Sequence, residues 1–270
     1  MSMMTLIRSW AVGLALIAAG AASAGGFSSA STHREEVASF PAEQVVAFSK
    51  KVEHALASSG ARVAIISRMG RPLSEMPEGM RYTHVAFAVY SSITTADGRT
   101  VPGYAIYNLY QRDGQPDVSD LVQDYPVDFF AGVAELESGV IIPSPALQRR
   151  LLQVIGSPTY RALHDPHYSL IANPYTLGKQ NCTEFVLDVV QASIYETSDI
   201  KVIKANTRAH FKSQVVNVSP LRLLAGAMFS AEIATSDQPT GLAETATFER
   251  IADYLRQYDP ATQVYTLLAR

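Results

Sequence analysis

The chain has 270 residues, with 22 basic and 25 acidic side chains and a net charge of −3. This weakly acidic balance lacks the basic surface by which proteins bind nucleic acids or anionic lipids, so we expect no nucleic-acid partner. The length suits one large domain.

The first 24 residues have the pattern of a secretory signal peptide. Arg8 gives a positive start, residues 10–22 form an apolar run of 13 residues, and Ala22-Ser23-Ala24 is a small-x-small cleavage pattern. A spanning helix needs about 20 apolar residues. We predict that residues 1–24 are removed and that residues 25–40 form a flexible mature N-terminus. The protein is then periplasmic or secreted, with no transmembrane segment left after cleavage.

Hydrophobic spacing and turn residues predict the elements of the mature chain. The expected helices run from Pro41 to before Gly60 and over residues 145–155, 182–195, 221–233 and 247–258. The expected strands cover residues 62–67, 82–90, 103–111, 215–218 and 263–268. Asp97-Gly98 predicts a hairpin turn between the second and third strands. The mixture predicts one α+β domain over residues 41–270, with an antiparallel sheet packed against helices and a C-terminal helical extension.

Cys182 is the only cysteine and lies where a helix is expected to begin. Asn181 is a favourable N-cap, and Glu184 stands three residues later, as in a capping box. Cys182 then falls in the first turn, where the helix dipole favours an anion. A thiol pKa near 8.5 must fall by roughly 1–3 units, about 1.4–4 kcal/mol, to give a thiolate at neutral pH. A helix terminus supplies at best about 2 kcal/mol, so a reactive thiol here also requires a nearby imidazolium.

Among the six histidines, His84 suits this role best because it lies near the start of an apolar strand. Its own face of the strand continues with Ala86 and Ala88, which are small enough for a helix to pack closely. The N-terminus of the helix that carries Cys182 is expected to lie over this face.

The hairpin offers an amide that could orient the imidazole. Directly opposed residues of an antiparallel pair have numbers with a constant sum. A sum of 195 places Gln111 opposite His84, whereas a sum of 192 places Asn108 there. Either amide could accept a hydrogen bond from one imidazole nitrogen and fix its tautomer. We favour Asn108, whose short side chain is held among tyrosines.

These strings resemble two known families. The order of a His strand, an amide strand and an Asn-Cys-x-Glu-Phe helix is similar to that of the circularly permuted papain-like NlpC-type superfamily. Asn181, Cys182, Phe185 and Val186 match the Asn-Cys-x-x-Phe-Val string of its lecithin:retinol acyltransferase relatives. The chain from Thr83-His84-Val85 through Asn173-Pro174-Tyr175 to residues 181–185 also resembles an exported bacterial family catalogued as domain of unknown function 2145.

The first resemblance implies a permuted papain-like (NlpC-type) fold and thiol chemistry on amide or ester carbonyls, by hydrolysis or acyl transfer. The second implies no activity. One departure concerns the third polar residue, which is often a histidine in the permuted relatives, while this hairpin offers only Asn108 or Gln111.

The sequence thus predicts an exported thiol hydrolase or acyltransferase. Cys182 would attack a carbonyl, His84 would act as general base and then acid, and Asn108 or Gln111 would orient it. The Cys182 N–H would contribute to an oxyanion hole. Tyr168 and Tyr175 would wall the substrate cleft. Export points to a cell-wall peptide or a lipid-derived acyl substrate.

Two other readings of the thiol stay open. In one, Cys182 is a buried passenger in a non-catalytic domain of the same fold that binds a cell-envelope ligand. In the other, Cys182 forms an intermolecular disulfide. His164-Asp165-Pro166-His167 has chelating residue types, but Pro166 prevents a helical His-x-x-His face. We therefore expect no metal and no cofactor.

Overall fold

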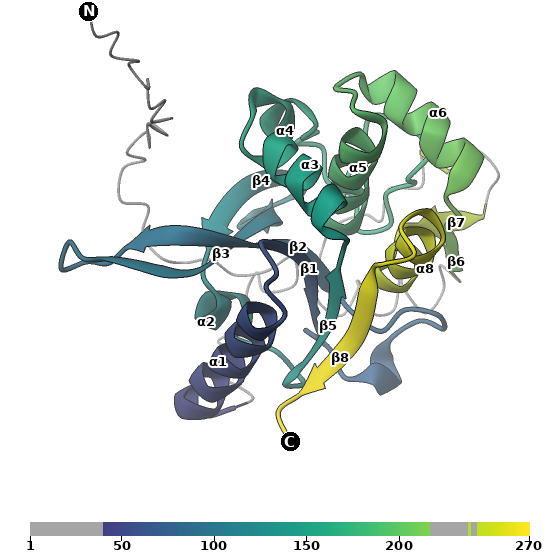
Figure 1. Cartoon of the computed structure of the whole chain (residues 1–270). Helices are drawn as coiled ribbons and strands as arrows, with labels where there is room; N and C mark the ends of the chain where they lie inside the picture. Colours follow the sequence, from purple (N-terminus) through teal and green to yellow (C-terminus); the bar gives the residue numbers. More distant parts are fainter. Residues whose placement is uncertain (1–39, 217–236, 239–241) are drawn as a thin grey trace, which may run out of the picture.

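The computed structural model describes residues 40–216, 237–238 and 242–270 (Figure 1). The predicted signal peptide, almost all of the predicted flexible N-terminus and the predicted helix over residues 221–233 lie outside the described residues. Within the described ranges, no helix has both the length and the apolar character needed to cross a membrane.

The described residues form helices and strands in mixed order. The helices are α1 (Ala42–Ser58), α2 (Pro126–Phe129), α3 (Pro145–Ile155), α4 (Pro158–Ala162), α5 (Cys182–Tyr195), α6 (Ile200–His210) and α8 (Phe248–Tyr258), with a short 3₁₀ helix η1 (Leu73–Glu75). The strands are β1 (Val63–Arg68), β2 (His84–Thr94), β3 (Thr100–Arg112), β4 (Gln115–Asp124), β5 (Glu137–Ile142), β6 (Gln214–Val216), β7 (Ala243–Thr245) and β8 (Gln263–Leu268).

Six of the strands form one sheet in the order β4-β3-β2-β1-β5-β8, and all of its pairings are antiparallel. Strands β6 and β7 form a separate antiparallel pair. The predicted α+β class, with an antiparallel sheet packed against helices, is therefore confirmed. Strand β4, strand β5 and helix α6 have no counterpart among the predicted elements.

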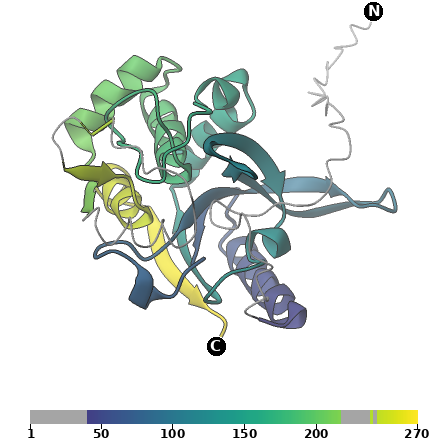
Figure 2. The same cartoon turned by 180° about the vertical axis from the view of Figure 1, so that it is seen from behind.

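Helices cover both faces of the sheet and create two apolar cores (Figures 1 and 2). Helices α3, α5 and α8 pack on the face that presents Val85 and Phe87 of β2. Helices α1 and α2 pack on the other face, which presents Ala86 and Ala88. Side chains alternate between the two faces along a strand, so neighbouring residues of β2 belong to different cores.

The β2–β3 hairpin has a register that differs from both predictions. Thr94 pairs with Thr100, and the Thr95 N–H donates to the Arg99 carbonyl, which leaves a three-residue turn with Gly98 at φ 79°. The numbers of directly paired residues consequently add up to 194, and not to 195 or 192 as predicted. The predicted turn was centred between Asp97 and Gly98, whereas a three-residue turn is centred on one residue.

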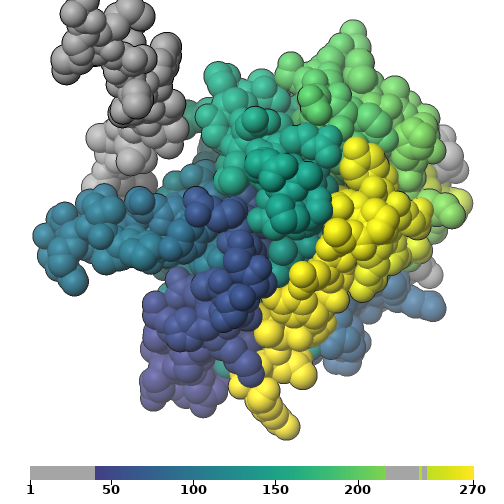
Figure 3. Space-filling model, in the orientation of Figure 1, coloured from purple at the N-terminus to yellow at the C-terminus, as the bar shows by residue number. Residues whose placement is uncertain are grey.

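The C-terminal segment forms the predicted helix, α8, and then joins the main sheet through β8. Strand β8 pairs with β5 along residues 263–268, and α8 contributes Ile251 and Leu255 to the core that contains α5. In the space-filling view, β8 (yellow) lies beside α1 (purple) (Figure 3). The spacing of residues 247–258 predicts this helix, but a local pattern does not tell where a helix docks.

Candidate active site

Helix α5 begins at Cys182 because Asn181 caps it, as predicted. The Asn181 Oδ1 accepts a hydrogen bond from the Glu184 N–H at 2.9 Å. The Asn181 Nδ2 donates to the Leu170 carbonyl at 3.1 Å and to the Thr245 hydroxyl at 3.2 Å. The start of α5 is thereby tied to two other segments, and Cys182 occupies the first turn.

The Glu184 side chain does not complete the predicted capping box. Its carboxylate is buried and accepts a hydrogen bond from Lys204 of α6 at 2.6 Å, instead of turning back to the Asn181 N–H. Lys204 also donates to both oxygens of Asp188, at 2.8 and 2.9 Å. A buried ammonium needs anionic partners, and this long-range demand overrides the local capping pattern.

The Cys182 thiol is buried, with 3% of the residue exposed. Its sulfur lies 3.7 Å from the Thr183 hydroxyl. Burial raises the pKa of the thiol above its usual value. The main chain of Val85, the Thr183 hydroxyl and the charge of Arg68 lower the pKa but only partly oppose that rise. At rest the thiol therefore carries its proton, and the predicted thiolate is not the ground state.

His84 and Asn108 are brought together, as the favoured prediction required. The His84 Nε2 lies 3.0 Å from the Asn108 Oδ1, and the imidazole stacks on the Tyr110 ring with 4.8 Å between centroids. Continuing the register of the hairpin places Tyr110 directly opposite His84, so Asn108 reaches the imidazole diagonally across the strands. Gln111 is on the other face and donates to the Pro116 carbonyl at 2.6 Å, so it does not contact His84.

The side chains of Cys182 and His84 lie on opposite faces of the sheet at the start of β2. The His84 ring also lies 5.7 Å from the Phe129 ring of α2, in the α1–α2 layer, whereas Cys182 packs with Val85 in the α5 core. The prediction that α5 lies over the face with Ala86 and Ala88 is wrong, because α1 and α2 fill that face. The His84 Nε2 meets the Asn108 Oδ1, and the Cys182 sulfur meets the Thr183 hydroxyl.

Cys182 and His84 nevertheless lie near the same short segment of β2. The paired part of β2 and β3 begins only at Phe87 and Tyr107, so the strands are unpaired at His84 and Val85. Cys182 lines the same pocket as Thr83, the residue before His84, and the Val85 main chain lowers the pKa of the thiol. We call this place, where β2 and β3 separate between the thiol and the imidazole, the β2–β3 split.

Burial lowers the pKa of His84 well below 6.5, and the charge of Arg68, directly opposite on β1, lowers it further. The hydrogen bond with Asn108 opposes both effects without overcoming them. The resting site therefore pairs a neutral thiol with a neutral imidazole.

This neutral imidazole predicts a loss of stability in acid. Below about pH 6.5 the unfolded His84 binds a proton that the folded one does not, so the free energy of unfolding falls with a slope approaching about 1.4 kcal/mol per pH unit. Urea unfolding of the wild type and His84→Gln between pH 8 and 5 isolates this slope. His54→Gln changes an exposed histidine and is the control, so its free energy of unfolding should depend on pH as that of the wild type does. Parallel pH curves for wild type and His84→Gln would contradict the prediction.

A small pocket of about 60 Å³ leads to the thiol. Tyr168, Thr83 and Thr183 line it beside Cys182, and none of the described residues in its wall is charged. Tyr175 is not among them. Its hydroxyl accepts a hydrogen bond from the Ser213 N–H at 2.8 Å and donates to the Phe211 carbonyl at 3.1 Å. The structure thus places Tyr168 at the thiol pocket, and it gives Tyr175 a packing role.

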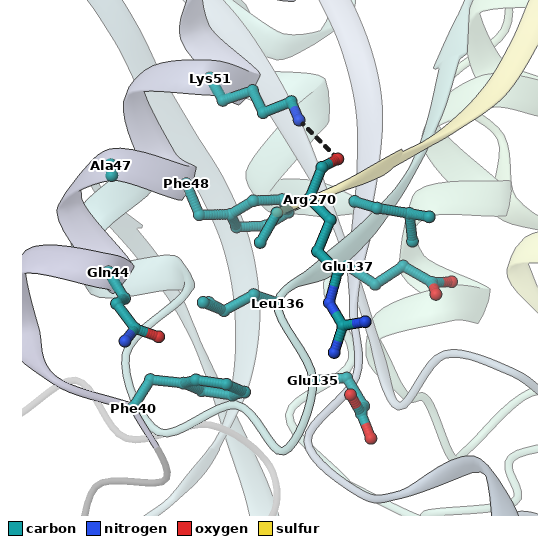
Figure 4. Close-up of a pocket in the computed structure, with 11 residues that line it drawn as sticks. Phe40, Gln44, Ala47, Phe48, Lys51, Glu135, Leu136, Glu137 and Arg270 are labelled. Atoms are coloured by element: carbon teal, nitrogen blue, oxygen red, sulfur yellow. Dashed lines mark hydrogen bonds between the residues drawn. The ribbon is translucent and has the colours of Figure 1, made fainter.

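A larger pocket of about 630 Å³ lies between α1 and the end of β8 (Figure 4). Phe40, Lys51, Glu135 and Arg270 line it, and Lys51 donates to the Arg270 main-chain carbonyl at 3.2 Å. Among the described residues that line this pocket there is no predicted site residue, no cysteine and no histidine. The thiol pocket is therefore the one where the chemistry-bearing residues gather.

The histidines near residue 165 are used in local contacts. The His164 Nε2 lies 3.0 Å from the Ser119 hydroxyl, and the His167 Nδ1 lies 2.7 Å from the Asp165 carboxylate. Across the described part of the chain, no group of three or more His, Cys, Asp or Glu side chains is arranged to hold a metal ion.

Two charged residues near the imidazole were missed by the sequence reasoning. Arg68 lies over the Tyr110 and Phe129 rings, at 5.6 and 5.1 Å from their centroids, and donates to the Phe129 carbonyl. Asp124 accepts a hydrogen bond from the Asn108 amide. In the sequence, Arg68 and Asp124 show only as charged residues at the ends of strands. That position does not indicate that they lie near His84.

Comparison with known proteins gives one match. A family model described as "Uncharacterized protein conserved in bacteria (DUF2145)" matches residues 55–255, which is well over half of the chain. No curated protein and no solved structure is significantly similar to it.

Proposed function

The chain belongs to the DUF2145 family of uncharacterized bacterial proteins, and we propose that it is an exported thiol hydrolase or acyltransferase acting on an amide or ester carbonyl. One observation carries the proposal. At the β2–β3 split Cys182 lines a pocket together with Thr83, the residue before His84, and Asn108 holds the imidazole.

The proposed reaction starts from the neutral pair. His84 lies on the other face of the sheet, so its imidazole must first swing past the open β2–β3 split. The Cys182 thiol then gives its proton to the Nδ1 of His84 as the sulfur forms a bond to the substrate carbonyl carbon. The Cys182 N–H, in the first turn of α5, stabilises the oxyanion. The imidazolium returns the proton to the leaving amine or alcohol, which departs and leaves a thioester. Water or an acceptor alcohol then attacks the thioester, gives its proton to His84 and releases the sulfur, which is reprotonated.

The proposal also includes the type of fold and the cellular location. The order along the chain, with the histidine strand before the cysteine helix, supports a permuted papain-like arrangement. The signal-like pattern of residues 1–24 supports a periplasmic or secreted location. The described residues that line the thiol pocket carry no charge, which suits an acyl group without charge beside its carbonyl. Cell-wall peptides and lipid-derived esters are the proposed substrates in that location.

Acylation by p-nitrophenyl acetate tests the proposal, because the ester is small and uncharged. We expect intact-mass analysis to show one acetyl group per molecule on Cys182, together with a burst of nitrophenolate. Removing a general base typically lowers such a rate by roughly 10²–10⁴-fold. His84→Ala should therefore acylate at least about a hundredfold more slowly than wild type.

The control is His54→Ala, which removes an exposed histidine of α1 and should react at the wild-type rate. Cys182→Ala should take up no acetyl group. The proposal fails if Cys182 in the folded protein reacts no faster than free cysteine at pH 7 and His84→Ala leaves that rate unchanged.

A second candidate function is a non-catalytic domain that binds a cell-envelope ligand. The raised pKa of the Cys182 thiol favours it, since a protonated thiol is a poor nucleophile. In that case Cys182→Ala keeps both its stability and its binding to isolated cell envelope, and no ester acylates the protein.

A further inference from the structure

Behind His84 lies a chain of hydrogen bonds that ends at a buried carboxylate. The Asn108 Nδ2 donates to the Asp124 Oδ1 at 2.8 Å, and the Tyr110 hydroxyl donates to the Asp124 Oδ2 at 2.8 Å. All four residues are buried. Asp124 therefore accepts two hydrogen bonds from buried donors.

This arrangement decides which way the Asn108 amide faces. A carboxylate is an acceptor only, so it requires the Nδ2 of Asn108 on its side and turns the Oδ1 toward His84. The Ile106 carbonyl supports the same orientation through a longer bond of 3.3 Å to the Nδ2. Because the Oδ1 can only accept, the His84 Nε2 must carry the hydrogen, and Nδ1 is the basic nitrogen.

The charges around the carboxylate are of both signs. The Arg68 guanidinium lies over the Tyr110 ring and lowers the pKa of Asp124, whereas Asp128 raises it. Burial is the largest effect and raises the pKa of Asp124 to about 7. At pH 8.5 the side chain is therefore mostly ionised, and the acceptor-only form can be studied.

We propose that Asp124 is a positioning residue that fixes the Asn108 amide and, through it, the Nε2–H tautomer of His84. The effect on tautomer follows from the hydrogen bonds alone. Its effect on reaction rate rests on the proposed function, because Nδ1 is the nitrogen that would take the proton of Cys182.

An isosteric pair of substitutions separates this role from simple support of the fold. In Asp124→Asn the amide offers one oxygen to two donors, Tyr110 and Asn108. The Tyr110 hydroxyl can donate to that oxygen. The new NH₂ group then donates to the Oδ1 of an Asn108 amide that has rotated by 180°, so that the Asn108 NH₂ faces His84. Adding Tyr110→Phe removes the competing donor, so the oxygen becomes available to Asn108 again.

The readouts are long-range ¹H–¹⁵N spectra of the His84 ring and the acetylation rate of Cys182, both at pH 8.5 in the full folded chain. Asp124→Asn should shift His84 toward the Nδ1–H tautomer and slow acetylation by roughly ten- to a hundredfold. Tyr110→Phe alone should change neither readout by more than about twofold. The double variant Asp124→Asn, Tyr110→Phe should recover the Nε2–H tautomer and most of the rate.

Each outcome decides between the claims. The inference is overturned if Asp124→Asn keeps the Nε2–H tautomer, or if the double variant is no better than Asp124→Asn. If the tautomer changes and recovers as expected but wild-type Cys182 is not acetylated, the positioning role stands and the proposed function falls. If acetylation depends on His84 but not on Asp124, the proposed function stands and the inference falls.

Discussion

Replacing Lys204 by methionine is expected to lower the free energy of unfolding by about 3–5 kcal/mol. Lys204 is buried between Glu184 and Asp188, and its Nζ bonds to both carboxylates. Burial lowers its pKa, but the charges of Asp188 and Glu184 outweigh burial and raise it. Methionine fills a similar volume and leaves two buried carboxylates without a counter-charge.

Urea unfolding at pH 7 measures this loss, with Lys201→Met as the matched control on the exposed face of α6. The control should stay within about 0.5 kcal/mol of wild type. Burial already raises the pKa of Glu184 and of Asp188, and the substitution raises both further. A carboxyl pKa raised by folding favours the folded state at low pH and loses that contribution as pH rises. The gap between Lys204→Met and wild type should therefore narrow toward pH 5, and equal stability at pH 7 would contradict the ion cluster.

Replacing Phe185 by alanine is expected to lower the free energy of unfolding by about 3–5 kcal/mol. Phe185 is fully buried in the core between α5 and the sheet. Its ring meets the Tyr160 ring edge-on at 5.0 Å between centroids and the His164 ring at 6.2 Å. Alanine removes these contacts and leaves a cavity one turn from Cys182.

The matched control for Phe185→Ala is Val202→Ala, which truncates an exposed apolar side chain of α6. Val202→Ala should lose less than about 0.5 kcal/mol, and Phe185→Leu should fall between the two because it fills part of the cavity. Chemical unfolding followed by circular dichroism gives all three values. A loss below about 1 kcal/mol for Phe185→Ala would mean that α5 is not anchored through this ring.

Local signals in the sequence are strong enough to locate α5. Asn181 caps the helix, and the spacing of Phe185, Val189 and their neighbours predicts its buried face, so the expected bounds 182–195 match the structure. Pro41 and Gly60 bracket α1 in the same way, with Gly60 at φ 70° just after the helix. Caps and periodicity act within one element, and these are the features that a single sequence shows.

The meeting of His84 with Asn108 was predicted, although the register that suggested it was wrong. A diagonal neighbour on an antiparallel pair is about 7–8 Å away at the backbone, within reach of long side chains. The histidine and the asparagine therefore still meet across the strands. This contact survives a register error of two because the side chains, not the backbone, close the distance.

The face on which each residue lies could not be predicted. Strand β2 is buried on both sides, so its pattern gives no sign of which helix covers Ala86 and which covers Val85. Lys204 and Arg68 find their partners through contacts between distant segments. Asp124 lies on β4, which pairs with the strand of Asn108, and β4 was not predicted.

The depth of the Cys182 sulfur has a practical consequence for handling the protein. A disulfide requires the two Cα atoms to come within about 4.4–6.8 Å of each other. The Cys182 Cα lies at the buried start of a helix, with 3% of the residue exposed, so a thiol on a second molecule cannot approach it while the chain is folded. The folded protein should therefore form no Cys182–Cys182 disulfide in air, and covalent dimers should form only through unfolded molecules.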